Sequence, residues 1–219
     1  MEIKPILFNA EMVRAILDGR KTCTRRAVKH NVKAMLNSQY HMEHPEVEDA
    51  WLIKKLCRPP YEPGDILYVR ETWERFECWN CEGDERGNCP KEPKKSVLDK
   101  TCGCYMYRAT DEISGDAKWH PSIHMPKEAA RIWLKVTNVR VERLQEITED
   151  GAKAEGANWK NGQNVGWEEK MKRTATERFA EIWNSTIKKS DLDRYGWAAN
   201  PWVWAIEFER CEKPEEERR

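Results

Sequence analysis

The segment GRKTCTRR, residues 19 to 26, gathers side chains that can bind anions or take part in hydrolysis. Four of its eight residues are basic, and two threonines and one cysteine lie among them: Arg20, Lys21, Thr22, Cys23, Thr24, Arg25 and Arg26. Forked guanidinium donors suit a phosphate or the edge of a base, whereas the alternative is a solvated positive face. A threonine hydroxyl near a lysine of lowered pKa can also act as an activated nucleophile. The segment therefore predicts an anion-binding edge, with hydrolytic chemistry as a second use.

A second group of reactive side chains lies in the cysteine-rich stretch 77–104. Between residues 82 and 101 this stretch has only two sizeable apolar residues, so it cannot build a core of its own. Four thiolates around a structural Zn²⁺ would supply the missing folding energy, and C-x2-C spacing suits two ligands of one tetrahedral site. Free thiols or redox chemistry are the alternatives. The expected ligands are Cys78, Cys81, Cys102 and Cys104, with Cys89 as a substitute for either of the last two.

Composition limits the kind of protein this is. The 219 residues include 38 basic and 38 acidic side chains, which argues against coating of nucleic acid by charge alone and makes any anion site local. With 39% hydrophobic residues and 11 Trp, we expect one packed domain over 1–210, the cysteine-rich stretch as an insert, and a charged tail over 211–219. We find no membrane-spanning segment or signal peptide and expect a cytoplasmic protein, where thiols more often bind metal than form disulfides.

Periodicity indicates the elements that must position these groups. Asn9 is a candidate cap for a helix that runs to Asp18 and ends at Gly19, so GRKTCTRR begins where that helix stops. Residues 28–56 are polar and show little periodicity. A turn at 63–65 leads into a strand from Ile66 to about Trp73.

The second half of the chain shows a similar mixture of elements. Alternation predicts a strand over 132–141, interrupted at 137–138, and a short helix follows with Thr148 as its cap. A longer amphipathic helix is expected from Glu168 to about Trp183, and a half-buried strand over 202–208. The order of elements indicates an α+β domain with a small mixed or barrel-like sheet.

Four separated blocks, in this order along the chain, resemble the ASCH domain family, a branch of the PUA-like fold, and especially its phage and prophage members. They are KPILFNAEMVRAILDGRKTCTRR, PGDILYVRETW, HPSIHMPKEAARIWLKVTNVRVERLQEITEDGAKAEG and NPWVWAIEF, and they cover about Lys4 to Arg210. The resemblance implies a PUA-like small mixed β-barrel with flanking helices and a cleft suited to RNA or a nucleotide.

One bacterial member of the family removes the acetyl group from N4-acetylcytidine with a Lys, a Thr and a Glu. Its RKTxTxR element is similar to residues 20–26 here, and its acid lies in a segment like TEDGAKAEG, which points to Glu155. The resemblance implies Thr24 as nucleophile, Lys21 as its activator and Glu155 as a proton shuttle or orienting group. This chain is about twice as long as that enzyme and carries the thiol insert. Further candidates for contact with substrate are Arg20, Arg25, Arg26, Glu71, Trp73 and His124.

A geometric condition applies to the proposed chemistry. In a regular strand, Lys21 and Thr24 are an odd number of residues apart and face opposite ways. Both reach one cleft only if the backbone turns or bulges between them.

We expect the protein to bind a base, modified or unmodified, of a nucleic acid or nucleotide. The alternatives are an amidohydrolase acting on an N4-acylated cytidine, a ribonuclease, and a zinc-containing interaction protein.

Overall fold

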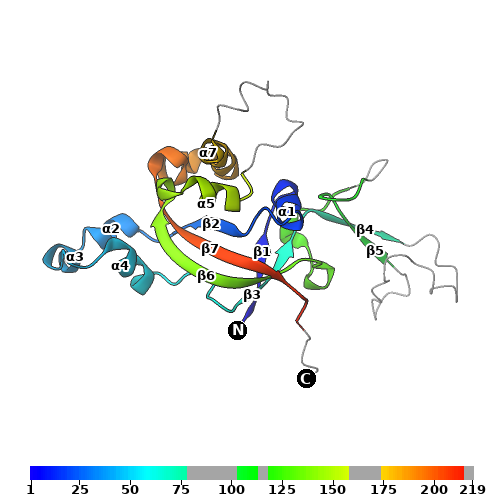
Figure 1. Ribbon diagram of the computed structural model, residues 1–219, viewed down its shortest axis with the longest axis horizontal. Helices are drawn as coiled ribbons and strands as arrows, with labels where there is room; N and C mark the ends of the chain where they lie inside the picture. Colours follow the sequence, from blue (N-terminus) through cyan, green and yellow to red (C-terminus); the bar gives the residue numbers. More distant parts are fainter. Residues whose placement is uncertain (78–102, 113–117, 158–173, 215–219) are drawn as a thin grey trace.

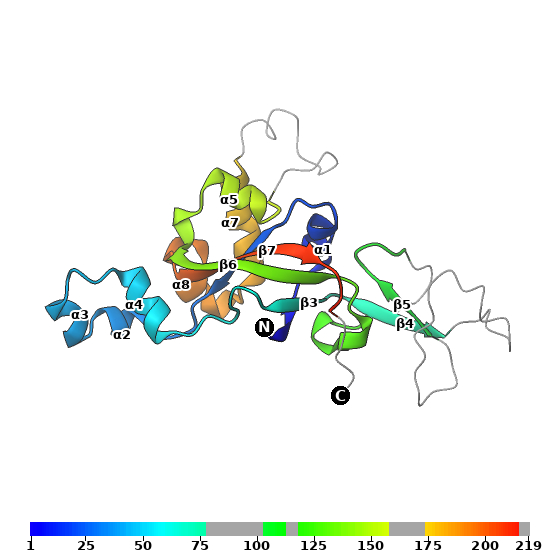
Figure 2. The ribbon, with the colours of Figure 1, turned by 60° about the horizontal axis from the view of Figure 1, so that its bottom comes forward.

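The computed structural model describes residues 1–77, 103–112, 118–157 and 174–214. At its centre is a five-stranded mixed sheet in the order β1-β3-β6-β7-β2, and a separate two-stranded sheet, β4-β5, projects from one end (Figures 1 and 2). The strands are β1 (Ile3–Leu7), β2 (Cys23–Ala27), β3 (Ile66–Arg70), β4 (Trp73–Glu77), β5 (Gly103–Tyr107), β6 (Trp133–Arg143) and β7 (Trp202–Cys211). β1 and β3 are parallel, and the other pairs are antiparallel. The expected α+β class is therefore confirmed.

Helices pack on both faces of this sheet and at one end of it. They are α1 (Ala10–Leu17), α2 (Val32–Leu36), α3 (Gln39–Glu43), α4 (Asp49–Leu56), α5 (Glu149–Ala154), α7 (Ala175–Thr186) and α8 (Leu192–Tyr195). α5 and α7 lie together over one face of β6 and β7, whereas α2, α3 and α4 form a group at the end opposite β4-β5 (Figure 1). No helix of the described residues has the length and apolar character needed to cross a membrane.

Two apolar clusters hold these layers together. The larger joins Val13 and Ile16 of α1 to strand residues such as Leu134 and Ile206. The smaller joins Phe179 and Trp183 of α7 to Ala152 of α5 and Val203 of β7, among others. Because these side chains are almost fully removed from water, their burial is the main force that fixes the helices to the sheet.

The expected closed barrel is not formed by the described residues, in which β1 and β2 are the two edges of an open sheet. One side chain reaches from one edge to the other. The Arg26 guanidinium donates to the Leu7 carbonyl at 2.9 Å and lies over the Phe8 ring, 5.5 Å from its centroid. A side chain thus occupies the place where backbone pairing would close a barrel.

Several local predictions are confirmed. Asn9 caps α1 by accepting from the Met12 N–H, and Gly19 follows the helix with a φ of +71°. Thr148 caps α5 by accepting from the Gly151 N–H. The interruption of the alternation at 137–138 corresponds to a β-bulge between Val136 and Asn138. These features depend on neighbouring residues alone, which is why the sequence predicts them well.

Other predictions are wrong or only partly right. β7 is not half-buried, because it lies between β6 and β2 with helices over it, and Val203 and Ala205 on its second face are fully buried. The strand expected from Ile66 to Trp73 is divided, since β3 ends at Arg70 and β4 begins at Trp73. The described part of the helix expected from Glu168 begins at Ala175, and residues 158–173 lie outside the described residues.

Candidate functional site

Lys21 reaches the candidate site from a turn that precedes β2. The backbone N–H groups of Arg20 and Lys21 both donate to the Ala15 carbonyl, at 2.8 and 2.9 Å, so the chain folds back as soon as α1 ends. Lys21 then forms an isolated antiparallel bridge with Glu155, directly after α5, and the regular strand begins only at Cys23. Residues 21 to 24 therefore do not form one straight strand. The alternation of a strand thus does not force the Lys21 and Thr24 side chains to opposite faces.

The Lys21 ammonium and the Glu155 carboxylate form a buried ion pair. Lys21 Nζ lies 2.6 Å from Glu155 Oε2, and it also donates to the carbonyls of Glu155 and Cys23, at 3.0 and 2.8 Å. Burial lowers the pKa of Lys21, and the charge of Glu155 opposes that shift. An ammonium carries three protons, and all three have acceptors here. In this arrangement Lys21 orients Glu155 and has no free lone pair with which to act as a base.

Arg25 extends the same network on the other side of Glu155. Its Nε lies 2.7 Å and its Nη2 2.6 Å from Glu142 Oε1, and its Nη1 lies 3.3 Å from Glu155 Oε1. The Arg25 side chain is about 1% exposed. Its donors are therefore directed at two internal carboxylates, and the guanidinium is poorly placed to hold the phosphate that the sequence suggested.

A cavity of about 310 Å³ opens beside this network. Its lining includes Thr24 and Glu155 together with Phe179 and Trp183 of α7. Thr24 is only 2% exposed, and its hydroxyl has no hydrogen-bond partner among the described residues. We call this space the β2–α7 cavity; its lining comprises Met12, Thr24, Arg25, Arg26, Ala27, Lys29, Glu155, Ala157, Phe179, Ile182, Trp183, Thr186 and Ile187.

The free edge of β2 also runs along this cavity. Thr22 O accepts from Phe208 N–H, and Val28 N–H donates to Trp202 O, both at 2.9 Å, so the even-numbered residues of β2 face β7. In an antiparallel pair the intervening residues direct their N–H and C=O groups away from the partner. Arg25 and Ala27 thus present backbone donors and acceptors at an unpaired strand edge.

The remaining predicted contact residues are not part of the cavity lining. Arg20 pairs with Asp18 at 2.8 Å on the surface. Glu71 is 1% exposed and is held in a two-pronged pair by Arg131, at 2.8 and 2.9 Å, which is a structural arrangement. Burial raises the pKa of Glu71, against the effect of Arg131.

Trp73 and His124 lie in the region of β4-β5 and the turns that follow. Trp73 packs between the rings of His120 and Tyr105, with centroid separations of 5.1 and 5.7 Å. His124 is exposed at the end of the 3-10 turn Ser122–His124. The structure brings neither of them to the β2–α7 cavity.

Sequence reasoning missed the roles of Glu142, Phe179 and Trp183. The apolar periodicity of α7 indicates that its two aromatic residues are buried, but it does not indicate that they also line a cavity. Glu142 offers no sequence signal, because its partner Arg25 lies 117 positions away and the two meet only through the sheet. Long-range register, rather than local pattern, brings this carboxylate to the site.

The predicted zinc site lies almost wholly outside the described residues. Cys78, Cys81, Cys89 and Cys102 belong to the range 78–102, and for Cys104 only the backbone position, in β5, is described. Among the described residues, no group of three or more His, Cys, Asp or Glu side chains could hold a metal ion. Cys23, Cys57 and Cys211 are free, as expected.

The chain was compared with protein-family models, with curated proteins and with solved structures, and none of the three comparisons found a match. The function must therefore be argued from the geometry of the chain itself. Its principal features are a buried network of alternating charges and, beside it, a cavity of about 310 Å³ that is lined by a threonine and by two aromatic residues.

Proposed function

We propose that this protein is a PUA-like module of the ASCH type that binds a base, modified or unmodified, of a nucleic acid or nucleotide in the β2–α7 cavity. The observation that carries this proposal is that Thr24, whose hydroxyl has no hydrogen-bond partner among the described residues, lines the same cavity as the aromatic side chains of α7. Ligand pockets typically combine an apolar lining with a few fixed polar groups, and their volumes begin at about 300 Å³.

The chemistry of the lining suits a nucleobase. Trp183 offers a ring on which a base can stack, whereas the Phe179 ring is already covered by the Arg25 guanidinium, and such stacking is worth about 1–3 kcal/mol per base. The outward N–H and C=O groups of Arg25 and Ala27 can pair with the polar edge of a base. Glu155 adds a carboxylate whose position is fixed by Lys21.

The cavity lining also includes an exposed cation, Lys29. The guanidinium of Arg26, another lining residue, is instead directed at the Leu7 carbonyl. A phosphate attached to the bound base would thus meet a cation without any need for Arg25, which is engaged by carboxylates.

Titration calorimetry with the four ribonucleoside monophosphates, N4-acetylcytidine and a short RNA tests the proposal. We expect at least one of these ligands to bind, and the change Thr24→Val to weaken it by about 3- to 10-fold, the worth of one hydrogen bond. Thr22→Val is the matched control, because Thr22 is exposed and lies outside the cavity lining. The proposal is wrong if no ligand in the panel binds, or if the two variants behave alike.

Hydrolysis of N4-acylated cytidine is a second candidate, favoured by one observation: Thr24 and Glu155 line the same cavity, and Lys21 contacts Glu155. In that mechanism the Thr24 hydroxyl would attack the acyl carbonyl and give its proton to Glu155, and the C–N bond would break as Glu155 returns that proton to the leaving amine of cytidine. Water would then hydrolyse the acyl-Thr24 ester, which releases acetate and restores the hydroxyl. Lys21 would act through Glu155, since its own protons are all engaged.

Incubation with N4-acetylcytidine, followed by chromatography of the products, distinguishes this candidate. Release of cytidine and acetate that is lost in Thr24→Val and retained in Thr22→Val supports the hydrolase. Binding without any product supports the recognition module. Fragments from a short RNA in the same assay would support the ribonuclease alternative instead.

We also propose that the cysteine-rich stretch 77–104 binds a structural Zn²⁺ through four of its five cysteines. The proposal rests on the spacing of the thiols and on the lack of apolar residues in that part of the sequence. It is independent of the β2–α7 cavity, whose described lining contains no cysteine.

A further inference from the structure

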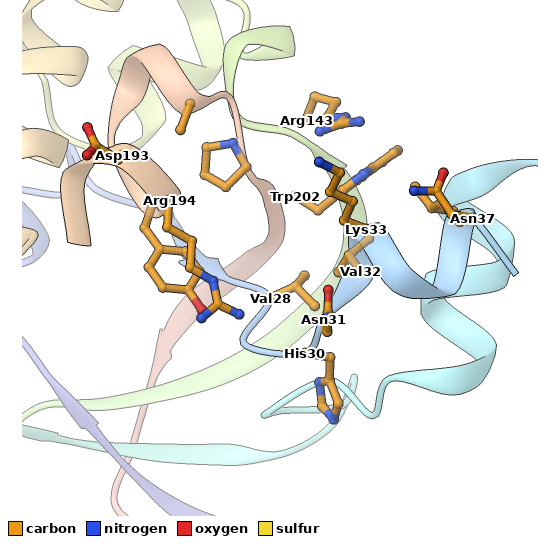
Figure 3. Close-up of a pocket in the computed structure, with 14 residues that line it drawn as sticks. Val28, His30, Asn31, Val32, Lys33, Asn37, Arg143, Asp193, Arg194 and Trp202 are labelled. Carbon is orange, nitrogen blue, oxygen red and sulfur yellow. The ribbon is translucent and has the colours of Figure 1, made fainter.

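A second and larger pocket lies beyond the end of β2, on the far side of residue 28 from the β2–α7 cavity. Its volume is about 620 Å³, and we call it the α2–α8 pocket after the two helices that flank it (Figure 3). Its lining comprises Val28, His30, Asn31, Val32, Lys33, Leu36, Asn37, Arg143, Asp193, Arg194, Tyr195, Ala199, Pro201 and Trp202. Neither the sequence patterns nor the proposed base site accounts for it.

The charge of this pocket differs from that of the whole protein. Lys33, Arg143 and Arg194 supply three positive charges and Asp193 one negative charge, a net excess of two in a chain whose net charge is zero. In Figure 3 Lys33 and Arg143 lie on one side of the pocket and Arg194 on another, while the Asp193 carboxylate points away from all three. The pocket is therefore suited to an anion.

Two of the three cations are held in place by aromatic rings, and none of the three is neutralised by a carboxylate of the described residues. Arg143 stacks over Trp202, 4.5 Å from the ring centroid, and donates one Nη1 hydrogen bond to the Asn200 carbonyl. Arg194 lies over the Tyr195 ring at 5.0 Å. Among the described residues, none of the three forms a salt bridge with a carboxylate. This contrasts with Arg25, whose guanidinium is fully used inside the protein.

Neutral donors surround these charges. Asn31 uses its side-chain oxygen to cap α2, accepting from Ala34 N–H at 3.2 Å, which leaves its amide N–H groups available. The indole N–H of Trp202 is buried and has no hydrogen-bond partner in the described structure. Buried donors normally have acceptors, so an oxygen-rich ligand or water is the expected partner for this group. Phosphate oxygens accept such bonds and compensate the charge together.

The two pockets are joined by a single stretch of chain. Thr24–Ala27 and Lys29 contribute to the β2–α7 cavity, and Val28 and His30–Lys33 contribute to the α2–α8 pocket. Five residues lie between Thr24 and His30, and six steps of extended chain span at most about 20 Å. A single strand of a few nucleotides can cover this distance, and site sizes of about 4–16 nucleotides are usual for single-strand binding domains.

We propose that the α2–α8 pocket holds phosphates of a single-stranded nucleic acid whose base occupies the β2–α7 cavity. The inference rests on the proposed function for the choice of ligand, but it uses different residues. The pocket binds the phosphodiester backbone and so carries no preference for sequence, whereas the cavity reads one base.

The test compares a single-stranded RNA of about eight nucleotides with a mononucleotide that can fill only the cavity. In the double variant Lys33→Ala, Arg194→Ala we expect the RNA to bind at least 10-fold more weakly and the mononucleotide to bind as before. The dependence of log K on log salt should become shallower by about 1.4, because about two phosphate contacts are lost. The control is Lys54→Ala, Lys55→Ala, which removes two exposed charges from α4 outside the pocket.

The outcomes separate the two proposals. The inference is wrong if the two double variants weaken RNA binding equally, or if a polyglutamate peptide competes for the pocket as well as the RNA does. The base site would then still be tested by Thr24→Val. If the pocket variant weakens RNA binding but Thr24→Val does not, the phosphate site stands and the base site falls. If neither the RNA nor the mononucleotide binds, both proposals are wrong.

Discussion

Lys21 Nζ and Glu155 Oε2 lie 2.6 Å apart, with side chains that are 0% and 5% exposed, and they join the start of β2 to the end of α5 across 134 positions of sequence. The same contact fixes the carboxylate of the β2–α7 cavity. Because each charge is shielded from water, Lys21 depends on Glu155 for its compensation, and Glu155 depends on Lys21 together with Arg25.

Removal of one partner should therefore be costly. We expect Lys21→Met or Glu155→Gln alone to lower the free energy of unfolding by about 3–5 kcal/mol, since a buried charge loses its nearest counter-charge. The double variant should lose less than the sum of the two, with a coupling of about 1 kcal/mol or more. Urea unfolding of the four proteins measures this cycle. If the two single losses in the free energy of unfolding add up to that of the double variant, the two side chains are not coupled.

Gly156 follows Glu155 and controls how closely α1 approaches this pair. Its φ is +83°, and an added Cβ would lie 2.9 Å from Ala15 Cβ and 3.3 Å from Lys21 Cβ. We expect Gly156→Ala to cost about 2–4 kcal/mol, the sum of a positive φ and overpacking. Gly64→Ala is the control, because Gly64 has a φ of +92° with nothing within 4 Å. It should cost only about 1–2 kcal/mol in the same unfolding assay. Equal losses would contradict the close approach.

Glu149 links α5 to the start of α7, which carries the aromatic wall of the cavity. Its Oε1 accepts from the Ala175 N–H at 2.7 Å and its Oε2 from the Thr176 N–H at 3.2 Å. The Ala175 hydrogen bond is the main reason that the pKa of Glu149 lies below 4.5, its usual value. The stabilisation is thus complete above about pH 4.5 and is lost as the pH falls through the lowered pKa.

Glu149→Gln tests this cap. We expect it to reduce stability near neutral pH by about 1 kcal/mol, as for other lost N-terminal caps, and the difference from the unchanged protein should shrink at about pH 3. Urea midpoints at the two pH values provide the measurement. Glu62→Gln is the control, since the Glu62 side chain is exposed and caps no helix. A difference that persists in acid would exclude the charged cap as its cause.

Metal content tests the cysteine-rich stretch. Elemental analysis of the purified protein should find about one zinc per chain, released when two ligands are replaced in Cys78→Ser, Cys81→Ser. Cys211→Ser should keep its zinc, because Cys211 is a free thiol in β7. Protein without zinc and with all eight cysteines titratable would refute the site.

The features that depend on near neighbours could be predicted from the sequence. The cap at Asn9, the stop at Gly19, the cap at Thr148 and the bulge after Val136 are confirmed, because turn and cap chemistry is decided within a few residues. The resemblance also directed attention to Lys21 and Glu155, which the structure brings into contact.

The partner of each charged side chain could not be predicted from near neighbours in the sequence. Arg25 and Arg26 are adjacent in sequence, yet Arg25 is enclosed by Glu142 and Glu155 while Arg26 reaches the Leu7 carbonyl. Glu71, a candidate for contact with substrate, pairs with Arg131, 60 positions away. In each case the partner is distant in sequence and is brought close only by strand register and helix packing.

By itself, the sequence determined the α+β class, the local starts and stops of several elements and the presence of a reactive segment after the first helix, because these follow from short-range periodicity and turn chemistry. Only the tertiary structure decided which cations remain free. Burial makes an ion pair obligatory for Arg25 and leaves Lys33 and Arg194 facing solvent, and that distinction arises from the way the sheet and helices exclude water.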